Sequence, residues 1–153
     1  MTPHPFSQRS SFFLCCLLTL STGVFANKKG SDIDGKTLQL FKQTFPNAEQ
    51  VKWIEQADKN TVNFKDDGVL IKIEYDKEGN FISSVRYYTE KNLPINILCK
   101  LQKKYGDKKV FRVTEMTTDN TVDYYIKLED DKSWTTVKSN ADGNFQVVEK
   151  YKK

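Results

Sequence analysis

An internal duplication is the feature that most constrains what this chain can fold into. Three apolar positions and one short segment recur at one common spacing: Leu38, Phe41, Phe45 and 60–64 match Leu98, Leu101, Tyr105 and 120–124. Segment 78–81 matches 142–145 at a longer spacing, so we infer that the second copy gained four residues. Such a recurrence indicates repeated structural units. The duplication predicts two repeats, at about 31–91 and 92–153.

Each repeat reads as one helix followed by about four strands. In the first repeat an apolar stripe spaced three and four residues apart predicts the helix, Ser31 or Asp32 can cap its start, and Pro46 ends it. In the second repeat Pro94 suits a first-turn position and Gly106 a C-terminal stop. We therefore expect two amphipathic helices that each bury one face.

The strand segments alternate with a period of two residues. In 69–75 and in 122–128, every second side chain is apolar, which is typical of antiparallel strands with one face much drier than the other. The segments 76–79 and 140–143 both start with Asp or Asn and end with Gly, which predicts type I hairpin turns closed by a glycine bulge. The predicted fold class is α+β: a tandem duplication of helix plus four antiparallel strands, forming one antiparallel sheet with both helices on one face.

Segment 1–26 reads as a signal peptide. Its apolar run, 12–20, is too short to span a bilayer of about 30 Å. Val24-Phe25-Ala26 fits a signal peptidase site, so we expect cleavage before Asn27. Cysteines in this segment raise a lipoprotein alternative, but a bulky leucine precedes the first of them, where a small residue is needed. We predict a periplasmic or secreted domain, 27–153, with no stable membrane anchor.

Cleavage would leave few groups for catalysis. His4 is the only histidine, and Cys99 is the only cysteine that remains after cleavage, so imidazole pairs, His-based zinc sites and an intramolecular disulfide are excluded from the exported chain. Residues 76–80 have the oxygen spacing of a calcium loop, but the twelfth position is Tyr87 rather than a bidentate acid. We predict no catalytic residue, no metal and no cofactor, and expect Cys99 to be a buried or half-buried side chain.

The charges do not identify a partner. A formal net charge of +4 is too small and too interspersed to indicate nucleic acid. The basic stretch 100–109 could meet an acidic partner or a membrane surface, but a solvated helix face is the commoner meaning. Adjacent acidic pairs at 66–67 and 130–131 would point to opposite faces of a strand, so turn chemistry is predicted for them.

The order of several short runs carries a resemblance to a known family. Residues 45–48, 75–80, 87–88 and 93–94 resemble the PepSY-like, beta-lactamase-inhibitor-like family of secreted Bacteroidetes proteins. The resemblance covers nearly all of 27–153. It implies a duplicated fold similar to beta-lactamase inhibitory protein, an exported location and a largely unassigned function. The second copy departs from the pattern, because 105–108 replaces the Phe-Pro-Asn-Ala run.

Aromatic side chains on the strands are the remaining functional signal. Neighbouring pairs such as Tyr87-Tyr88 and Tyr124-Tyr125 must place one ring on each face of the sheet. We predict a recognition surface on the open face made of Ile82, Arg86, Tyr88 and Tyr125, since tyrosine and arginine supply much of the binding energy at interfaces. The alternative is that these side chains pair across strands and only stabilise an exposed sheet.

Three function classes follow. The first is a non-enzymatic binding module that recognises a periplasmic or extracellular protein or peptide through the open sheet face. The alternative is a small-ligand-binding or envelope-stress accessory protein, which a pocket between helices and sheet would distinguish. A hydrolase comes last, because the chain lacks a recognisable nucleophile and base.

Overall fold

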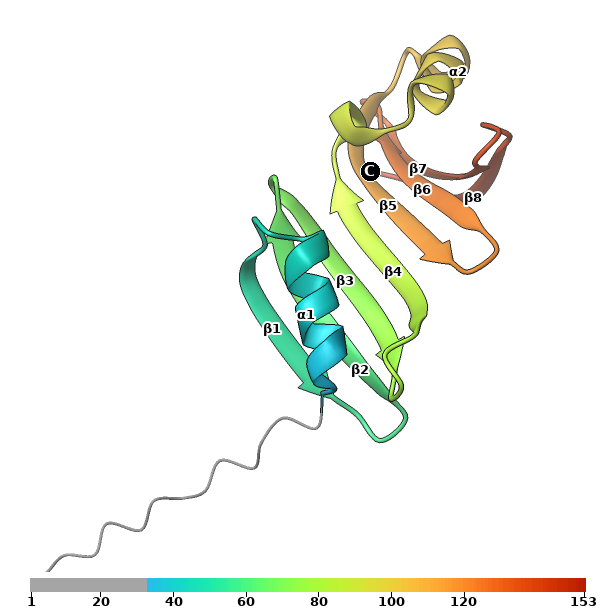
Figure 1. The fold of residues 1–153 in the computed structure, drawn as a ribbon. Coiled ribbons are helices and arrows are strands. Elements are labelled where there is room, and N and C mark those ends of the chain that lie inside the picture. The colour runs from blue at the N-terminus through green and yellow to red at the C-terminus, as the bar shows by residue number, and fades with distance from the viewer. Residues whose placement is uncertain (1–32) are drawn as a thin grey trace, which may run out of the picture. The chain divides into compact units, whose positions relative to one another are not determined.

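A computed structural model describes residues 33–153. The described chain contains two α-helices, eight strands and one short 3-10 turn (Figure 1). In chain order they are α1 (Gly35–Thr44), β1 (Glu49–Glu55), β2 (Lys59–Asp66), β3 (Val69–Asp76), β4 (Phe81–Tyr88), η1 (Glu90–Asn92), α2 (Ile95–Tyr105), β5 (Lys109–Thr118), β6 (Val122–Glu129), β7 (Ser133–Asn140) and β8 (Phe145–Lys152). The predicted signal peptide, 1–26, and its cleavage site before Asn27 lie outside the described residues.

All eight strands form one sheet in sequence order, and every neighbouring pair is antiparallel. The register carries one face continuously across the two repeats: Ile71 lies opposite Arg86, Arg86 opposite Glu115, and Glu115 opposite Tyr124. Buried residues of both repeats lie on this side and join one apolar cluster with the buried residues of α1 and α2. The predicted fold class is therefore confirmed. We call the side covered by the helices the helix face and the opposite side the outer face.

Local chemistry sets the helix ends, with two small corrections. Asp34 caps α1, because its Oδ2 accepts hydrogen bonds from the backbone amides of Lys36 at 3.1 Å and Thr37 at 3.3 Å. The expected caps, Ser31 and Asp32, lie outside the described residues. Pro94 is the residue before α2 rather than part of its first turn. Proline fits there because its missing N–H would lack an intrahelical partner at a helix start.

The two predicted glycine turns are present and alike. Gly79 has φ +87° and donates its amide to Asp76, and Gly143 has φ +76° and donates its amide to Asn140. Both glycines lie against the start of their repeat's helix. A Cβ on Gly79 would clash with Thr37 Oγ1, and one on Gly143 would lie 2.8 Å from Lys100 Cδ. Glycine is therefore required both for the turn conformation and for the approach of the helix.

The strand register corrects one part of the sequence alignment of the repeats. Trp53 pairs with Val62, and Val113 pairs with Ile126. Helix α1 and strand β1 therefore match α2 and β5 at the shorter spacing, which is the spacing between Leu38 and Leu98. Strands β2, β3 and β4 match β6, β7 and β8 at the longer spacing, that of Gly79 and Gly143. The expected match of 60–64 with 120–124 is wrong because the four extra residues lengthen the β5–β6 hairpin ahead of that point.

The core lies between the helices and the helix face of the sheet. Phe41 on α1 and Leu101 on α2 are 4% and 2% exposed, as expected from the two apolar stripes. Aromatic rings dominate under α1, and aliphatic side chains such as Ile126, Leu128 and Val137 dominate under α2. Among the described residues, neither helix is long and apolar enough to cross a membrane.

Candidate binding surface

The outer face carries one ring from each predicted tyrosine pair. Tyr87 is 37% exposed and lies on the outer face, whereas Tyr88 is 7% exposed and belongs to the core. Tyr124 is buried and Tyr125 is half-buried on the outer face. Each pair therefore divides between the faces as predicted, and the outer face holds one ring of each.

The prediction of which β4 side chains lie on the open face is wrong. Arg86 and Tyr88 lie on the helix face, because Arg86 is registered opposite the buried Ile71 and Tyr88 opposite the buried Val113. Two features explain the error. In β4 neither alternating set is wholly apolar, and a bulge between Glu74 and Tyr75 on the β3–β4 ladder shifts the register.

Arg86 and Tyr88 instead form a polar cluster with Glu115 between the repeats. The Tyr88 hydroxyl donates to Glu115 Oε2 at 2.5 Å, and Arg86 Nη1 donates to Glu115 Oε1 at 3.0 Å. The Arg86 guanidinium lies 5.3 Å from the Tyr88 ring centre. Burial, together with the hydrogen bond to the Glu115 carboxylate, raises the pKa of Tyr88 well above its usual value. The cluster joins β4 to β5 and holds the two repeats together.

The other two predicted site residues are not brought together with this cluster. Ile82 is 39% exposed and lies at the β4 bulge. Tyr125 lies on the outer face beside Lys138, whose Nζ is 5.6 Å from the ring centre and pairs with Asp123 at 2.8 Å. Of the four predicted residues, the register places only Tyr125 on the outer face with Tyr87.

A contiguous apolar band crosses the outer face at the other end of these strands. We call it the outer strip, and it consists of Leu70, Tyr87, Phe111, Trp134 and Tyr151. Leu70 and Tyr87 are cross-strand partners, and both line a groove of about 580 Å³ together with Phe111. The Phe111 and Trp134 rings meet edge to face at 5.0 Å, and Trp134 is the cross-strand partner of Tyr151. All members except Trp134 are between 37% and 49% exposed, so the strip is accessible.

A bulge in β5 places Phe111 in the strip. The β5–β6 register shifts between Val110 and Arg112, so the extra residue, Phe111, leaves the alternation and contacts Trp134. The surface predicted from the sequence contained none of the five residues of the outer strip. The only available signal was the equivalence of Tyr87 and Tyr151 in the two repeats, because a bulge cannot be located from alternation alone.

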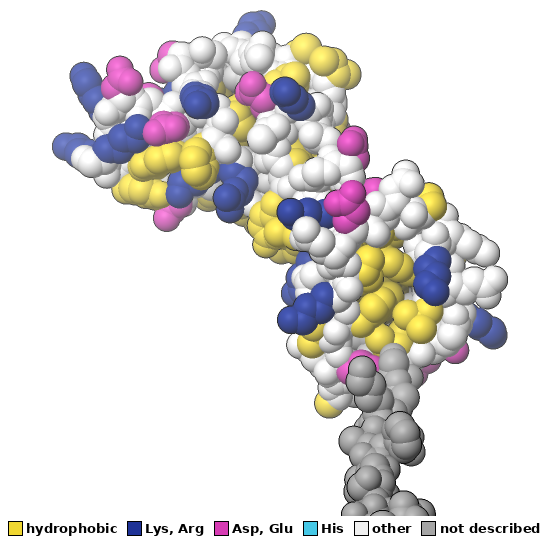
Figure 2. Space-filling view, turned by 90° about the vertical axis from the view of Figure 1, so that its left-hand side faces the viewer, with side chains coloured by type: hydrophobic (Ala, Val, Ile, Leu, Met, Phe, Trp, Pro, Cys, Tyr) yellow, Lys and Arg dark blue, Asp and Glu magenta, His cyan; other side chains and the backbone are white. Residues whose placement is uncertain are grey.

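Cationic side chains lie over the rings of the strip. Lys127 Nζ is 5.0 Å from the Trp134 ring centre and 5.3 Å from that of Tyr151, and Lys153 Nζ is 5.1 Å from Trp134. Arg112 lies 5.8 Å from the Phe111 ring. Lys153 also pairs with Glu129 at 2.6 Å, whereas Lys127 and Arg112 form no ion pair within the described part of the chain. In the upper part of Figure 2, the second repeat shows hydrophobic side chains with Lys and Arg side chains at their rim.

Charge divides unevenly between the repeats. Residues 92–153 contain 12 Lys and Arg against 9 Asp and Glu, a net charge of +3, whereas residues 31–91 contain 9 against 11, a net charge of −2. The part of the strip with the ring-bound cations thus belongs to the positive repeat. Such a surface favours a partner with acidic groups.

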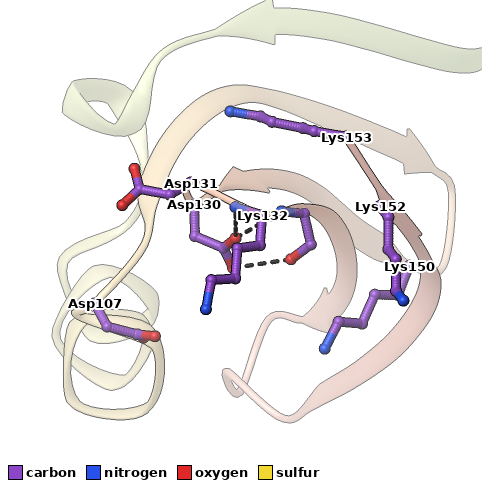
Figure 3. A pocket seen from close by; sticks show the side chains of 8 residues that line it. Asp107, Asp130, Asp131, Lys132, Lys150, Lys152 and Lys153 are labelled. Carbon is purple, nitrogen blue, oxygen red and sulfur yellow. Dashed lines mark hydrogen bonds between the residues drawn. The ribbon is translucent and has the colours of Figure 1, made fainter.

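A polar cleft of about 790 Å³ lies at one end of the second repeat (Figure 3). Lys150 and Lys152 of β8 form one wall, and Asp107 and Asp131 lie across from them. Asp130 is already saturated, because it accepts hydrogen bonds from the Lys108 ammonium, from two backbone amides and from the Ser133 hydroxyl. The Lys108 ammonium and these donors hold the pKa of Asp130 far below its usual range. This arrangement is turn chemistry, as predicted for 130–131.

Within residues 33–153, no group of three or more His, Cys, Asp or Glu side chains is arranged to hold a metal ion. Cys99 is a free, exposed thiol on α2, so the expectation that it is buried or half-buried is wrong. The apolar stripe of α2 runs through Leu98 and Leu101, and Cys99 lies outside it. The absence of catalysis and of a cofactor remains a prediction.

The described residues form a duplicated helix-plus-four-strand fold in which both helices lie on one face of the sheet and, within 33–153, no element covers the other face. A BLIP-like protein from Bacteroides fragilis has the same fold, with a TM-score of 0.56 and 18% identity over 79% of this chain and 85% of that one. A DUF2874 family protein from Bacteroides ovatus matches with a TM-score of 0.55 and 16% identity over 78% of this chain and 87% of that one. A Bacteroides eggerthii protein, assigned to the periplasm by name only, matches with a TM-score of 0.55 and 12% identity over 78% of this chain and 88% of that one. No family model and no curated protein matches the sequence.

Proposed function

We propose that this chain is an exported, non-enzymatic binding module that recognises an acidic protein or peptide through the outer face of its sheet. Its location would be the periplasm or the cell exterior, and its family the PepSY-like, beta-lactamase-inhibitor-like one. The observation that carries the proposal is the outer strip, where accessible rings lie beside cations, two of which, Lys127 and Arg112, have no acidic partner among the described residues. Recognition centres on this strip rather than on Arg86 and Tyr88, which are committed to Glu115.

Two physical arguments support this surface. Tyrosine, tryptophan and arginine dominate the energetically important contacts of protein interfaces, because they bury large areas with few rotatable bonds. An exposed apolar patch rimmed by polar groups is also unusual on a monomer that binds nothing. The fold neighbours support the location and the class only as far as their names go, because folds host many functions.

The experiment is site-specific photocrosslinking in the source cell's envelope. A crosslinking amino acid is placed at Tyr87 or Phe111 on the outer face and, as a matched control, at Leu40, which is exposed on α1. We expect one protein to be crosslinked from both outer-face positions and not from Leu40. Trp134→Ala in the same chains should abolish that product with little change in thermal midpoint. Equal crosslinking from Leu40, or none from the outer face, would contradict the proposal.

A second candidate function, binding of a small ligand, rests on a pocket of about 510 Å³ on the helix face. It lies beside the end of α1 and is lined by Phe45, Tyr75, Phe81, Ser84 and Arg86, among others. Apolar walls with a few polar groups are typical of small-molecule sites. Arg86 is already paired with Glu115, which weakens it as an anion anchor. A ligand that protects the protein against heat, and loses this effect in Phe81→Ser but not in Trp134→Ala, would favour this function over the first.

A further inference from the structure

The sheet has two edges, and they differ in charge. β1 is the edge of the first repeat and β8 the edge of the second, and nearly all their residues are exposed. The β1 sequence, EQVKWIE, has two acids and one base, whereas β8 ends in Glu149-Lys150-Tyr151-Lys152 and is followed by Lys153. An edge strand offers unpaired backbone groups to any strand that fits, and opposite charges favour a particular fit.

The junction between the repeats shows how such edges pair in this fold. There β4, the last strand of the first repeat, pairs with β5, the first strand of the second, from Ser83–Thr118 to Tyr88–Val113. On the helix face of this junction Arg86 lies opposite Glu115 and forms an ion pair with it at 3.0 Å. The Glu115 side chain is only 11% exposed, so the pair is part of the join.

The duplication places the same charges at the two free edges. At the longer spacing, which relates β4 to β8, Lys150 corresponds to Arg86. At the shorter spacing, which relates β1 to β5, Glu55 corresponds to Glu115. In the described part of the chain neither Lys150 nor Glu55 forms an ion pair, and both are exposed. The molecule therefore carries both halves of its own junction, unpaired, at opposite edges.

The bulges of β1 and β5 agree with this correspondence, whereas β8 is bulged at Val148 and β4 at Ile82, which are not equivalent positions. β1 is bulged between Glu49 and Lys52, and β5 is bulged at the equivalent place, between Val110 and Arg112. In β5 the residues beyond the bulge are the ones that pair with β4. Of the equivalent residues in the first repeat, Trp53, Ile54 and Glu55 belong to β1 and lie at the free edge of the sheet beyond the bulge, so three residues are free to pair.

We propose that β8 of one molecule pairs with β1 of a second copy of this chain in the way that β4 pairs with β5. The register of the junction then sets Lys150 opposite Glu55, Tyr151 opposite Ile54, and Lys152 opposite Trp53. The Lys150–Glu55 pair would lie on the helix face, beside the polar cleft of the second repeat. Because the two surfaces differ, the association is head to tail, and each dimer keeps one free edge of each kind. The proposal does not depend on the outer strip.

Sedimentation velocity of the purified protein over a range of concentrations tests the proposal without any other partner. We expect concentration-dependent association that weakens as salt increases. Lys150→Glu and Glu55→Lys should each weaken self-association by about tenfold or more, because like charges would then face each other in the pair. An equimolar mixture of the two variants should associate again, since each then offers a complementary edge to the other. Misfolding of either variant would not give this recovery.

Matched controls make the same charge changes elsewhere. Glu49→Lys lies on β1 before the bulge, and Lys103→Glu lies on an exposed position of α2. Both should associate like the unmodified protein. A protein that stays monomeric at every concentration would overturn the proposal, as would association that survives both Lys150→Glu and Glu55→Lys. A monomer that instead binds an unrelated acidic strand peptide at β8 would also overturn it, and would leave the proposed function of the outer face untouched.

Discussion

The two repeats follow the same chain path, but they place their tryptophans, with the rings that these contact, on opposite faces of the sheet. In the first repeat, Phe41 meets Phe45, Trp53 and Phe64 with ring centres 5.0 to 5.5 Å apart, all beneath α1. In the second repeat, Phe111 and Trp134 meet on the outer face instead.

Equivalent positions show how this exchange occurs. Trp53 and Tyr75 of the first repeat correspond to Val113 and Ser139 of the second, so α2 packs on smaller side chains. On the outer face the exchange runs the other way, because Leu70 corresponds to Trp134. The fold therefore needs an apolar layer beneath each helix but does not need particular rings there, and the second repeat has Phe111 and Trp134 on the outer face, where they can take part in recognition.

The largest effects should come from the two helix anchors. Phe41→Ala and Leu101→Ala remove equivalent buried side chains, and each should lower the free energy of unfolding by about 2 to 5 kcal/mol. Phe41→Ala should cost more, because three other rings lose a partner. Chemical denaturation measures both, with Leu40→Ala, an exposed position on α1, as the control. A change below about 0.5 kcal/mol in both variants would show that the helices do not anchor the repeats.

The next largest difference in stability between the repeats should come from substitutions of the two turn glycines. Gly79→Ala and Gly143→Ala both force alanine into a positive φ, at a cost of about 1 to 3 kcal/mol. Gly79→Ala should cost more, because its new methyl group meets the buried Thr37 on α1, whereas at Gly143 it meets the flexible Lys100 side chain. Thermal or chemical unfolding of the two variants makes the comparison. Equal losses would mean that α1 shifts as easily as a lysine side chain.

Removing a charge at the β4–β5 junction should lower the free energy of unfolding more than removing one at the free edge, β8. Glu115→Gln removes the charge that faces Arg86, and we expect a loss of about 1 to 2 kcal/mol, because hydrogen bonds to charged groups are strong but Arg86 is partly solvated. Lys150→Gln, at the position equivalent to Arg86, should change stability by less than about 0.5 kcal/mol in dilute monomer. Chemical denaturation at low protein concentration measures both. A larger loss at Lys150 would contradict the view that β8 is unpartnered in the monomer.

The smallest expected effect is the dependence of the protein's stability on pH through Asp130. Because the Lys108 ammonium and other donors lower the pKa of Asp130 in the folded state, this carboxylate stabilises the fold above its unfolded pKa, about 4, and the contribution is lost as the pH falls below that. Asp130→Asn should therefore be less stable than the unmodified protein at pH 7, with the gap closing in acid. Asp66→Asn is the matched control, because Ala48 stands where the second repeat has Lys108. A gap that stays constant with pH would exclude this ion pair as its cause.

The sequence predicted the architecture well because its signals are local and repeated. The stripe of α1, the alternation of β3 and β6 and the two glycine turns each depend on residues near one another in the chain. Their repetition at a nearly fixed spacing then predicted the number of elements and the common face of the helices. The candidate surface was predicted less well. Tyr125 was placed on the outer face correctly, but Arg86 and Tyr88 were not.

The sequence by itself determined the duplicated helix-and-strand order, the turns and the division of each tyrosine pair between the faces, because side-chain period and turn chemistry are properties of short segments. Only the tertiary structure decided which tyrosine of β4 faces outward, that Phe111 joins Trp134, and that Arg86 has an acidic partner while Lys150 has none among residues 33–153. These features depend on bulges and on the register between strands far apart in the chain. A shift of one residue moves every side chain of a strand to the other face, and only the paired strand determines which register holds.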